Sequence, residues 1–570
     1  MSKGNAKSSA AQVKRLLQER PETTVALNPM TGLHFDDLRD IATRTALQGA
    51  RQPLIFGKHV AGHARKLVDI LASVGDYSPE PGDPRFRDEA WQESAVYRRV
   101  MQAYLAMNES LEEWIDDLEL DAVDHLRAEF LLRIIGDSFA PTNTLLGNPA
   151  ALRKARETRG RSLLRGMKNL IGDVRNNHGI PSQVKGDPFE LGKNIAVSPG
   201  AVVFSNDVLE LIQYAPTTEQ VHRRPLLMVS APINKFYALD LTPDRSMIKY
   251  AVDNGFQVFA VSWANPTLAD ADWGVDRYAT AVMEAIPVVK AITRSKDLNL
   301  FALCSGAMMM SAMAACLKAR GDESIHSMTI GVCMLEMQQH DMELSAFASP
   351  AVFERVKKRS KKAGALRGHE LALSMLWLRP QELIWGNAVN NYLLGNEPPE
   401  FDLLFWNNDW TNLPAQLHCD VLDMFATAGL LTPGAMEVDG TALDLQAVDC
   451  DKFIFGGLTD HITPWEACYR SALAFGGKKE FVLSSSGHMQ TMLNAPGKKR
   501  TSFFVNKDLP EQADDWLESA DLEQGSWWPH WRDWLQARSL SRKAAPKRLG
   551  NKAYPPGVAA PGSYVLQQSD

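Results

Sequence analysis

Two patterns of hydrophobic and polar positions divide the chain near residue 185. Before that point, apolar residues recur at helical spacing, as in the segment "WQESAVYRRVMQAYLAMNESLEEWIDDL". Little in this part alternates with period two, as a half-buried strand would. We therefore expect residues 1–185 to form a mostly α-helical N-terminal domain.

From about residue 186, short apolar runs alternate with helical segments such as "DRYATAVMEAIPVVKAITRS". Runs of this length are typical of buried strands, and their alternation with helices predicts a parallel sheet covered on both faces. We expect residues 186–540 to form this α/β domain. The runs are "PLLMVSAP" (225–232), "GFQVFAVSW" (255–263), "LNLFALC" (298–304), "SMTIGVCML" (327–335), "DKFIFGGL" (451–458) and "KEFVLSSS" (479–486).

Two segments break this rhythm. More than a hundred residues separate Leu335 from Asp451, and an insertion of that length between strands predicts a helical lid at about 336–445. The basic, Pro- and Gly-containing tail at 541–570 is expected to be loosely ordered. Just before it lie four tryptophans, which are either surface anchors or, as we favour, ordinary helix packing: Trp527, Trp528, Trp531 and Trp534.

Composition narrows the class of protein. The chain has 570 residues, enough for two or three domains, and its net charge of -7 gives no reason to expect a nucleic-acid partner. Its six cysteines are scattered without a CxxC pair, which favours a reducing compartment over disulfides or a zinc site.

The N-terminus lacks the apolar core of a signal peptide. The most apolar stretch, Phe301–Leu317, is too short and too interrupted to span a membrane.

The candidate chemistry begins with Cys304, in the segment "LNLFALCSGAMMM". Here an apolar run feeds a helix-length segment through Cys-Ser-Gly, with Ala302 and Gly306 two positions either side of the cysteine. A nucleophile elbow needs small residues at those two positions, because its central residue occupies a sharp, strained turn. The alternative is a buried structural cysteine, a common fate of free thiols.

The order of candidate residues along the chain favours Cys304 as a nucleophile over Cys304 as a structural cysteine. An α/β-hydrolase places its nucleophile first, then its acid, then its base, with the last two on loops after late strands. Asp460 in "FIFGGLTDHITP" and His488 in "FVLSSSGHMQ" follow the last two apolar runs in that order. Each alone could be an ordinary turn or loop residue. His461 is a rival base, but a sequence neighbour is poorly placed for Asp460 to orient, so we assign it a supporting role.

The expected chemistry is covalent catalysis by a thiolate. An imidazole takes the thiol proton, and a helix N-terminus favours the anion. The backbone N–H of Ser305 would supply one oxyanion donor. The loop "SAPINKFY" would supply the second, near Ile233 or Asn234. A thiol suits transfer between thioesters, because the acyl-enzyme is close in energy to an acyl-CoA.

Long phrases spread over nearly the whole chain resemble the class II polyhydroxyalkanoate synthases, polymerases of medium-chain (R)-3-hydroxyacyl-CoA. Among them are "LNPMTGL", "APTNTLLGNPAA", "PINKFYALDLTPDRS", "LIWGNAVNNYLLGNEPPEFDLLFWNNDWTNLP", "DHITPWEACYRSALAFGG" and "SGHMQTMLNAPG".

The resemblance implies an α/β-hydrolase fold with a helical lid insertion and a mostly α-helical N-terminal domain. It implies a cytoplasmic homodimer that stays attached to polyester granules and holds the growing polyester chain, and it leaves granule-associated proteins open as further partners. It also implies Cys304 as the acylated nucleophile, His488 as general base and Asp460 as its partner, which is also suspected of activating the incoming 3-hydroxyl. No metal, redox cofactor, nucleic acid or transmembrane segment is implied.

The chain departs from the family around the expected active-site floor. The family's box is usually G-x-C-x-G-G, whereas this chain has Ala302 and Ala307 at the outer glycine positions. Three methionines follow at 308–310, for which we favour core filling, and Glu336 stands where relatives usually carry an aspartate. The basic run Arg355–Lys362 either steers CoA phosphates or is a solvated helix face.

Two alternatives to polymerisation stay open. The same scaffold could act as a Cys-dependent thioesterase or depolymerase if water reached the acyl-enzyme. The altered elbow also suggests a weakened or inactive paralogue that acts as a granule- or synthase-associated protein, although Cys304, Asp460 and His488 are all intact.

Overall fold

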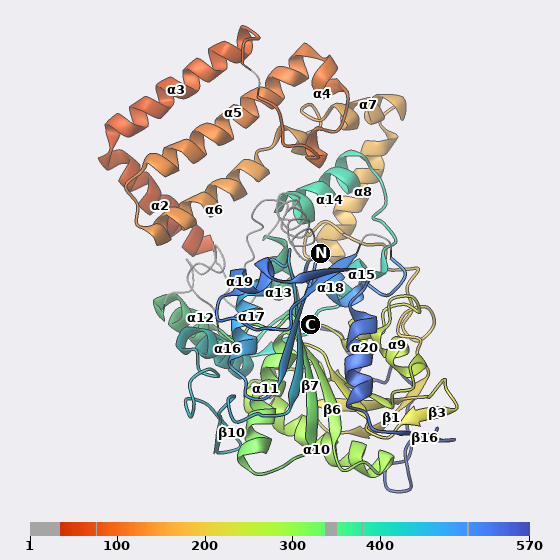
Figure 1. Ribbon diagram of the computed structural model, residues 1–570. Coiled ribbons are helices and arrows are strands. Elements are labelled where there is room, and N and C mark those ends of the chain that lie inside the picture. Colours follow the sequence, from red (N-terminus) through yellow and green to blue (C-terminus); the bar gives the residue numbers. More distant parts are fainter. Residues whose placement is uncertain (1–34, 76, 337–349, 378–379, 499–500, 570) are drawn as a thin grey trace, which may run out of the picture. The chain divides into compact units, whose positions relative to one another are not determined.

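The computed structural model describes residues 35–569 except 76, 337–349, 378–379 and 499–500. Its contacts divide the chain into two compact units (Figure 1). Of the described residues, one unit contains those within 189–372 and 402–569, and the other contains those within 35–188 and 373–401. The domain bounds expected from the sequence stay a prediction.

The first unit is built on a ten-stranded sheet. All six apolar runs identified in the sequence are its parallel central strands, so the predicted α/β fold is confirmed. Their continuous apolar character reflects burial on both faces. In spatial order they are β5 (Val258–Trp263), β4 (Leu226–Val229), β6 (Leu298–Leu303), β7 (Ile325–Gly331), β12 (Asp451–Gly457) and β13 (Lys479–Ser484).

Four antiparallel strands that the sequence analysis did not identify extend the sheet. On one side, β1 (Gly200–Ser205) and β2 (Leu209–Tyr214) form a hairpin whose turn is held by the Asn206 side chain, which accepts hydrogen bonds from the N–H groups of Val208 and Leu209. On the other side lie β14 (Ser502–Val505) and β15 (Asp521–Gln524).

Helices cover this sheet (Figure 1). The three methionines 308–310 are buried in α11, in agreement with core filling. The helices are α9 (Met247–Asp253), α10 (Val275–Thr293), α11 (Cys304–Ala319), α17 (Trp465–Leu473), α18 (His488–Leu493), α19 (Ala513–Glu518) and α20 (Trp528–Ala537).

The tryptophans near the C-terminus are core residues, as the packing interpretation predicts. Trp527 and Trp531 are buried and pack against Phe455 and Phe301 of the sheet. Their indole N–H groups are satisfied as well: Trp527 Nε1 donates to the Thr491 carbonyl at 2.8 Å and Trp531 Nε1 donates to Thr329 Oγ1 at 2.9 Å. A side chain that is both buried and hydrogen-bonded within the fold is not a surface anchor.

The insertion between β7 and β12 divides between the two units. Leu373–Phe401 belongs to the second unit, and the remainder belongs to the first; residues 337–349 of the predicted lid lie outside the described residues. Its elements are α12 (Pro350–Ala363), β8 (Ala365–Leu366), α13 (Gly368–Leu376), η6 (Gln381–Trp385), α14 (Gly386–Ala388), η7 (Val389–Leu393), α15 (Asp402–Asn407), β9 (Leu413–Pro414), α16 (Ala415–Thr427), β10 (Glu437–Val438) and β11 (Thr441–Ala442).

The basic run lies on α12, an amphipathic helix. Phe353 and Val356 pack with Leu422 of α16, while Lys357 forms an ion pair with Asp423 at 2.7 Å. Basic side chains opposite such an apolar face are typical of a solvated helix surface.

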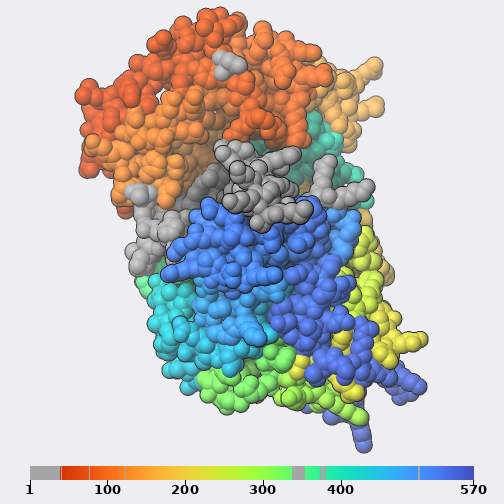
Figure 2. Space-filling view, viewed as in Figure 1, coloured from red at the N-terminus to blue at the C-terminus, as the bar shows by residue number. Residues whose placement is uncertain are grey.

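The C-terminal tail packs against the sheet, which differs from the loose order expected of it. β16 (Arg542–Ala544) pairs with β3 (Gln220–His222), and the backbone of residues 557–560 hydrogen-bonds to β1. Figure 2 shows these blue C-terminal residues beside the yellow residues of the first strands. The buried carboxylate of Glu210 on β2 accepts hydrogen bonds from the N–H groups of Ser563 and Tyr564 and from the Ser563 hydroxyl. A buried carboxylate needs such donors, and this need fixes the tail.

The second unit is helical. The small hydrophobic core of this unit contains Phe86, Trp91, Met101, Tyr104 and Ala140. Its helices, besides those of the insertion, are α2 (Phe35–Arg51), α3 (Pro53–Leu71), α4 (Ala90–Glu93), α5 (Ala95–Asp117), α6 (Ala122–Ser138), α7 (Pro149–Glu157) and α8 (Arg161–Asn176).

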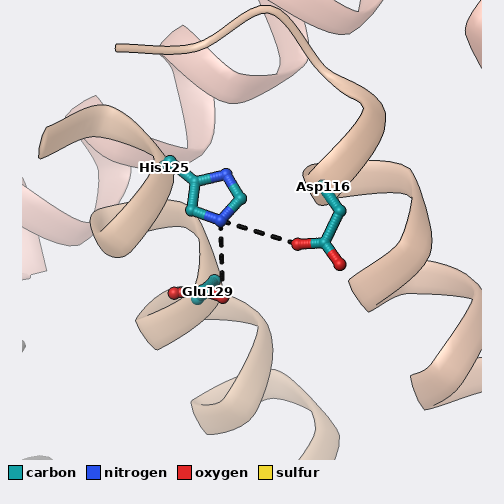
Figure 3. A group of neighbouring side chains, drawn as sticks. All are labelled: Asp116, His125 and Glu129. Atoms are coloured by element: carbon teal, nitrogen blue, oxygen red, sulfur yellow. Dashed lines mark ion pairs between the residues drawn. The ribbon is translucent and has the colours of Figure 1, made fainter. Parts of the chain in front are cut away.

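One polar group joins α5 to α6 at the surface of this unit (Figure 3). His125 Nε2 lies 3.5 Å from Asp116 Oδ1 and 3.4 Å from Glu129 Oε1. The three ligand atoms could hold a metal ion. Both carboxylates are largely exposed, however, and exposed ion pairs of this kind are common without one.

In the part of the chain that the structure describes, no helix is long and apolar enough to cross a membrane.

We expect Glu210→Gln to loosen the C-terminal tail. The amide replaces one acceptor oxygen with a donor that faces N–H groups, and an unsatisfied buried group of this kind costs about 1–3 kcal/mol. Limited proteolysis should then cut within residues 545–569 faster than in the parent protein. Glu219→Gln, at an exposed position before β3, is the control. Equal cleavage of all three proteins would contradict the role of Glu210 in fixing the C-terminal tail.

Candidate active site

Cys304 lies at a strained turn between β6 and α11. Its φ angle is +50°, in the left-handed region that non-glycine residues rarely occupy. Leu303 before it is extended, and the helix begins at the cysteine itself. The strain holds the side chain at the carboxyl end of the central strand, next to a helix N-terminus, which is the geometry of a nucleophile elbow.

Gly306 permits this turn. A Cβ atom at this position would lie 2.4 Å from the carbonyl oxygen of Ser230, in the loop that follows β4. The first turn of α11 is therefore pressed directly onto that loop. Ala302 and Ala307, which replace the family's outer glycines, are fully buried.

Asp460 and His488 come together after adjacent strands. Asp460 follows β12, and His488 begins α18 after β13. Asp460 Oδ2 lies 2.7 Å from His488 Nδ1. Its other oxygen, Oδ1, accepts hydrogen bonds from the N–H groups of Ile462 and Thr463 at 2.8 and 2.9 Å. The carboxylate is thus fixed by its own loop and aimed at the imidazole.

Thr463 is a further member of this group that the sequence analysis missed. Its hydroxyl donates to Asp460 Oδ2 at 2.9 Å and lies 3.2 Å from His488 Nδ1. The sequence signal that could have identified it is its position, three residues after the candidate acid and at the turn before α17.

The electrostatics couple His488 to both other candidates. Burial opposes its protonation, but the charge and hydrogen bond of Asp460, together with a hydrogen bond to Cys304, outweigh burial and raise the pKa of His488 to about 10. Conversely, burial raises the pKa of Asp460, while the charge of His488, the hydrogen bonds and the charge of His461 lower it overall. The structure therefore brings Cys304, His488 and Asp460 into one interacting group.

Two more cysteines interact electrostatically with this group. Burial raises the pKa of Cys333 and of Cys468 well above the usual thiol value, and the charge of Cys304 adds to the effect on both. Both are buried, whereas Cys304 is partly exposed. Of the three thiols, Cys304 is thus the one that a substrate can reach.

The two predicted oxyanion donors belong to two different elements. Ser305 is in the first turn of α11, and Ile233 is half-buried in the loop after β4. Glu336, a departure from the family, accepts a hydrogen bond from Arg470 Nε at 2.7 Å, so its carboxylate has a structural partner.

Several buried polar atoms on α11 and on the loop after β4 have no hydrogen-bond partner among the described residues. They are Ser305 Oγ on the helix that begins at Cys304, and Ser230 Oγ and Asn234 Nδ2 on the loop after β4. Unsatisfied buried groups are rare in native proteins, and each one needs an explanation such as a bound ligand.

The insertion fixes this loop. Thr411 donates its N–H to the Ile233 carbonyl at 3.3 Å and its hydroxyl to the Pro232 carbonyl. Trp406 Nε1 donates to the Lys235 carbonyl at 2.7 Å. The segment 402–412 thus fixes the loop predicted to carry an oxyanion donor.

A parallel-centred sheet with a nucleophile elbow, followed by an acid and a histidine on late loops, defines an α/β-hydrolase. In agreement, residues 238–495 match the model of the alpha/beta hydrolase fold, and residues 82–251 match that of the poly-beta-hydroxybutyrate polymerase (PhaC) N-terminus. The chain belongs to the poly(3-hydroxyalkanoate) polymerases, which are transferases, and the resemblance drawn from the sequence is confirmed.

Two relatives match this chain over almost their whole length. It is 46% identical to poly(3-hydroxyalkanoate) polymerase 1 of Ectopseudomonas oleovorans, over 97% of this chain and 99% of the relative. It is 43% identical to poly(3-hydroxyalkanoate) polymerase 2 of the same organism, over 95% of this chain and 96% of the relative. Among solved structures, the chain resembles a monoacylglycerol lipase from Paleococcus ferrophilus, with 15% identity, a TM-score of 0.31, and coverage of 49% of this chain and 88% of that chain. We draw nothing from a similarity that low.

We expect His488 to stabilise the fold up to alkaline pH. In the unfolded chain a histidine titrates near 6.5, whereas in the fold the pKa of His488 is about 10. The stabilisation is therefore complete below pH 6.5 and is lost as the pH rises through about 10. The thermal midpoint of the parent protein minus that of His488→Gln should shrink between pH 7 and pH 10.

His326→Gln is the control. Burial and the charge of Arg224 lower the pKa of His326, so its titration affects stability only on the acid side. A constant difference between the parent and His488→Gln across the alkaline range would contradict the assigned shift.

Proposed function

We propose that this polymerase joins (R)-3-hydroxyacyl-CoA units into polyhydroxyalkanoate, with release of CoA, through an acyl-enzyme on Cys304. The single observation that carries the proposal is the interacting group of Cys304, His488 and Asp460 at the carboxyl ends of three strands. A thiol is a suitable acceptor, because exchange between CoA and Cys304 replaces one thioester by another.

In the first step the Cys304 thiolate attacks the substrate carbonyl, and CoA leaves as the tetrahedral intermediate collapses. Because the pKa of His488 is about 10, this imidazole holds a proton at neutral pH. That proton can pass to the CoA sulfur as it departs.

The negative oxygen of that intermediate needs hydrogen-bond donors. We assign the backbone N–H of Ser305 and that of Ile233 as the oxyanion hole. Contact between the first turn of α11 and the loop after β4 supports this pairing. His461, next to Asp460, has a supporting electrostatic role, since its charge helps to lower the pKa of that carboxyl.

In the second step the 3-hydroxyl of the next unit attacks the acyl-enzyme and must lose its proton. Of the two candidate bases, we favour His488. Both Asp460 oxygens are already engaged, by two N–H groups, the Thr463 hydroxyl and His488, and the pKa of Asp460 is lowered. A carboxylate in that state is a weak base and a good anchor for the imidazole.

We further propose a medium-chain substrate, and a homodimer at the surface of cytoplasmic polyester granules. These features rest on the likeness to the class II synthases. We also retain from the sequence the expectation that no metal or redox cofactor takes part.

We expect Cys304→Ala to lower CoA release from 3-hydroxydecanoyl-CoA by about a thousandfold or more, because it removes the group that becomes acylated. Cys316→Ala, which removes a buried thiol from the same helix, is the matched control and should keep most of the activity. If Cys304→Ala released CoA as fast as the parent protein, the acyl-enzyme assignment would fail. Soluble hydroxyacids in place of polymer would instead identify a thioesterase or depolymerase.

Expression in a host without its own synthase tests chain length and activity together. Medium-chain precursors should yield stainable granules, and short-chain precursors should yield few. Granules from short-chain precursors alone would overturn the medium-chain assignment. No granules and no CoA release from either precursor would favour an inactive paralogue.

A further inference from the structure

Helix α8 presents an apolar stripe that none of the described residues covers. Leu164, Met167, Ile171 and Val174 recur at intervals of three and four residues, so they line one side of the helix. They are 74%, 56%, 44% and 61% exposed, respectively. Contiguous exposed apolar side chains of this kind mark interaction surfaces in proteins.

The rotation of α8 about its axis is fixed by its opposite side. A Cβ atom at Gly166 would lie 1.8 Å from the carbonyl oxygen of Tyr392, so the helix packs directly against the backbone of η7. The Tyr392 hydroxyl donates to Asp173 Oδ2 at 2.8 Å, and Asn169 Nδ2 donates to the Asn391 carbonyl at 3.0 Å. These contacts lock one face inward and leave the apolar stripe outward.

A row of cations borders the stripe. Arg161, Lys168 and Arg175 are exposed and occupy the sector of the helix next to Leu164 and Ile171. The one acidic residue of α8, Asp173, is buried and hydrogen-bonded on the inward face. The outward surface of α8 is therefore apolar and carries positive charge, in a chain whose net charge is -7. One acid outside the helix lies near this border: the pKa of Glu397 is lowered by Lys185 and, to a smaller extent, by the charge of Lys168.

We propose that this face of α8 binds an anionic phospholipid surface. The helix would lie parallel to the surface, with the apolar stripe among the acyl chains and the three cations at the phosphates, the arrangement typical of interfacial amphipathic helices. Arginine and lysine suit this border because their long stems follow the apolar phase while their charges stay in water. This inference goes beyond the proposed function and does not depend on the cysteine chemistry.

Charge favours lipid over a second copy of the chain. In a pair of stripes, the cations of one helix would border those of the other, which costs energy unless acids intervene. Helix α3 gives a contrast within the same unit. It also exposes apolar residues, including Val60 and Val68, but its lysines Lys58 and Lys66 are ion-paired with acids of α5.

The test is sedimentation of the full chain with phosphatidylglycerol-containing vesicles and with pure phosphatidylcholine vesicles, at low and high salt. The parent protein should prefer the anionic vesicles, and the preference should weaken with salt. Leu164→Gln/Ile171→Gln should weaken binding about tenfold or more at either salt concentration, since it removes buried apolar area. Arg161→Gln/Lys168→Gln/Arg175→Gln should lose the preference for anionic lipid, roughly fivefold per cation.

Val60→Gln/Val68→Gln on α3 is the matched control and should bind like the parent protein. All these positions are exposed, so the thermal midpoints should agree. CoA release from soluble substrate should stay at the parental rate in every variant, so failure here is distinguishable from failure of the proposed chemistry. Equal vesicle binding by the parent and both α8 variants, or no binding by the parent, would overturn the proposal. So would a change of oligomeric state in the apolar variant with vesicle binding retained.

Discussion

The site depends on one constraint, the backbone strain at Cys304. A φ angle of +50° is unfavourable for any residue with a side chain, and it persists only where the surroundings over-determine it. Here β6 before the cysteine is a fully buried central strand, and α11 after it is buried over most of its length. Neither element can shift to relieve the strained turn, so the thiol is held at the carboxyl edge of the sheet. Asp460 and His488 lie at the same edge, because they follow β12 and β13.

The sequence predicted what depends on local pattern and missed what depends on distant partners. Six strands were found because burial on both faces makes them continuous apolar runs. The hairpin β1–β2 was missed, since its β2 strand includes the polar residues Glu210 and Gln213. Glu210 is buried there because the C-terminal tail, more than three hundred residues later, supplies its donors. No local pattern carries that information, and the same contact explains why the basic tail is ordered.

The same division applies to the site. Chain order suggested Cys304, Asp460 and His488, whereas the coupling of Cys333 and Cys468 to the Cys304 thiol became visible only in three dimensions. The loop after β4 illustrates why the sequence could not reveal such interactions. Its Lys235 is buried beside Asp409, and its ammonium donates to the carbonyl of Gln567, so the insertion and the tail both hold a loop that the sequence could only describe as following a strand.

The departures from the family's glycine pattern separate by physical role. Gly306 is the position where an added Cβ would meet backbone, at 2.4 Å, and backbone cannot give way as a flexible side chain can. This glycine is retained. The alanines at 302 and 307 are buried among core side chains, where packing can adjust to one methyl group. Both substitutions therefore change side-chain packing beside the elbow and leave the strained turn at residue 304 in place.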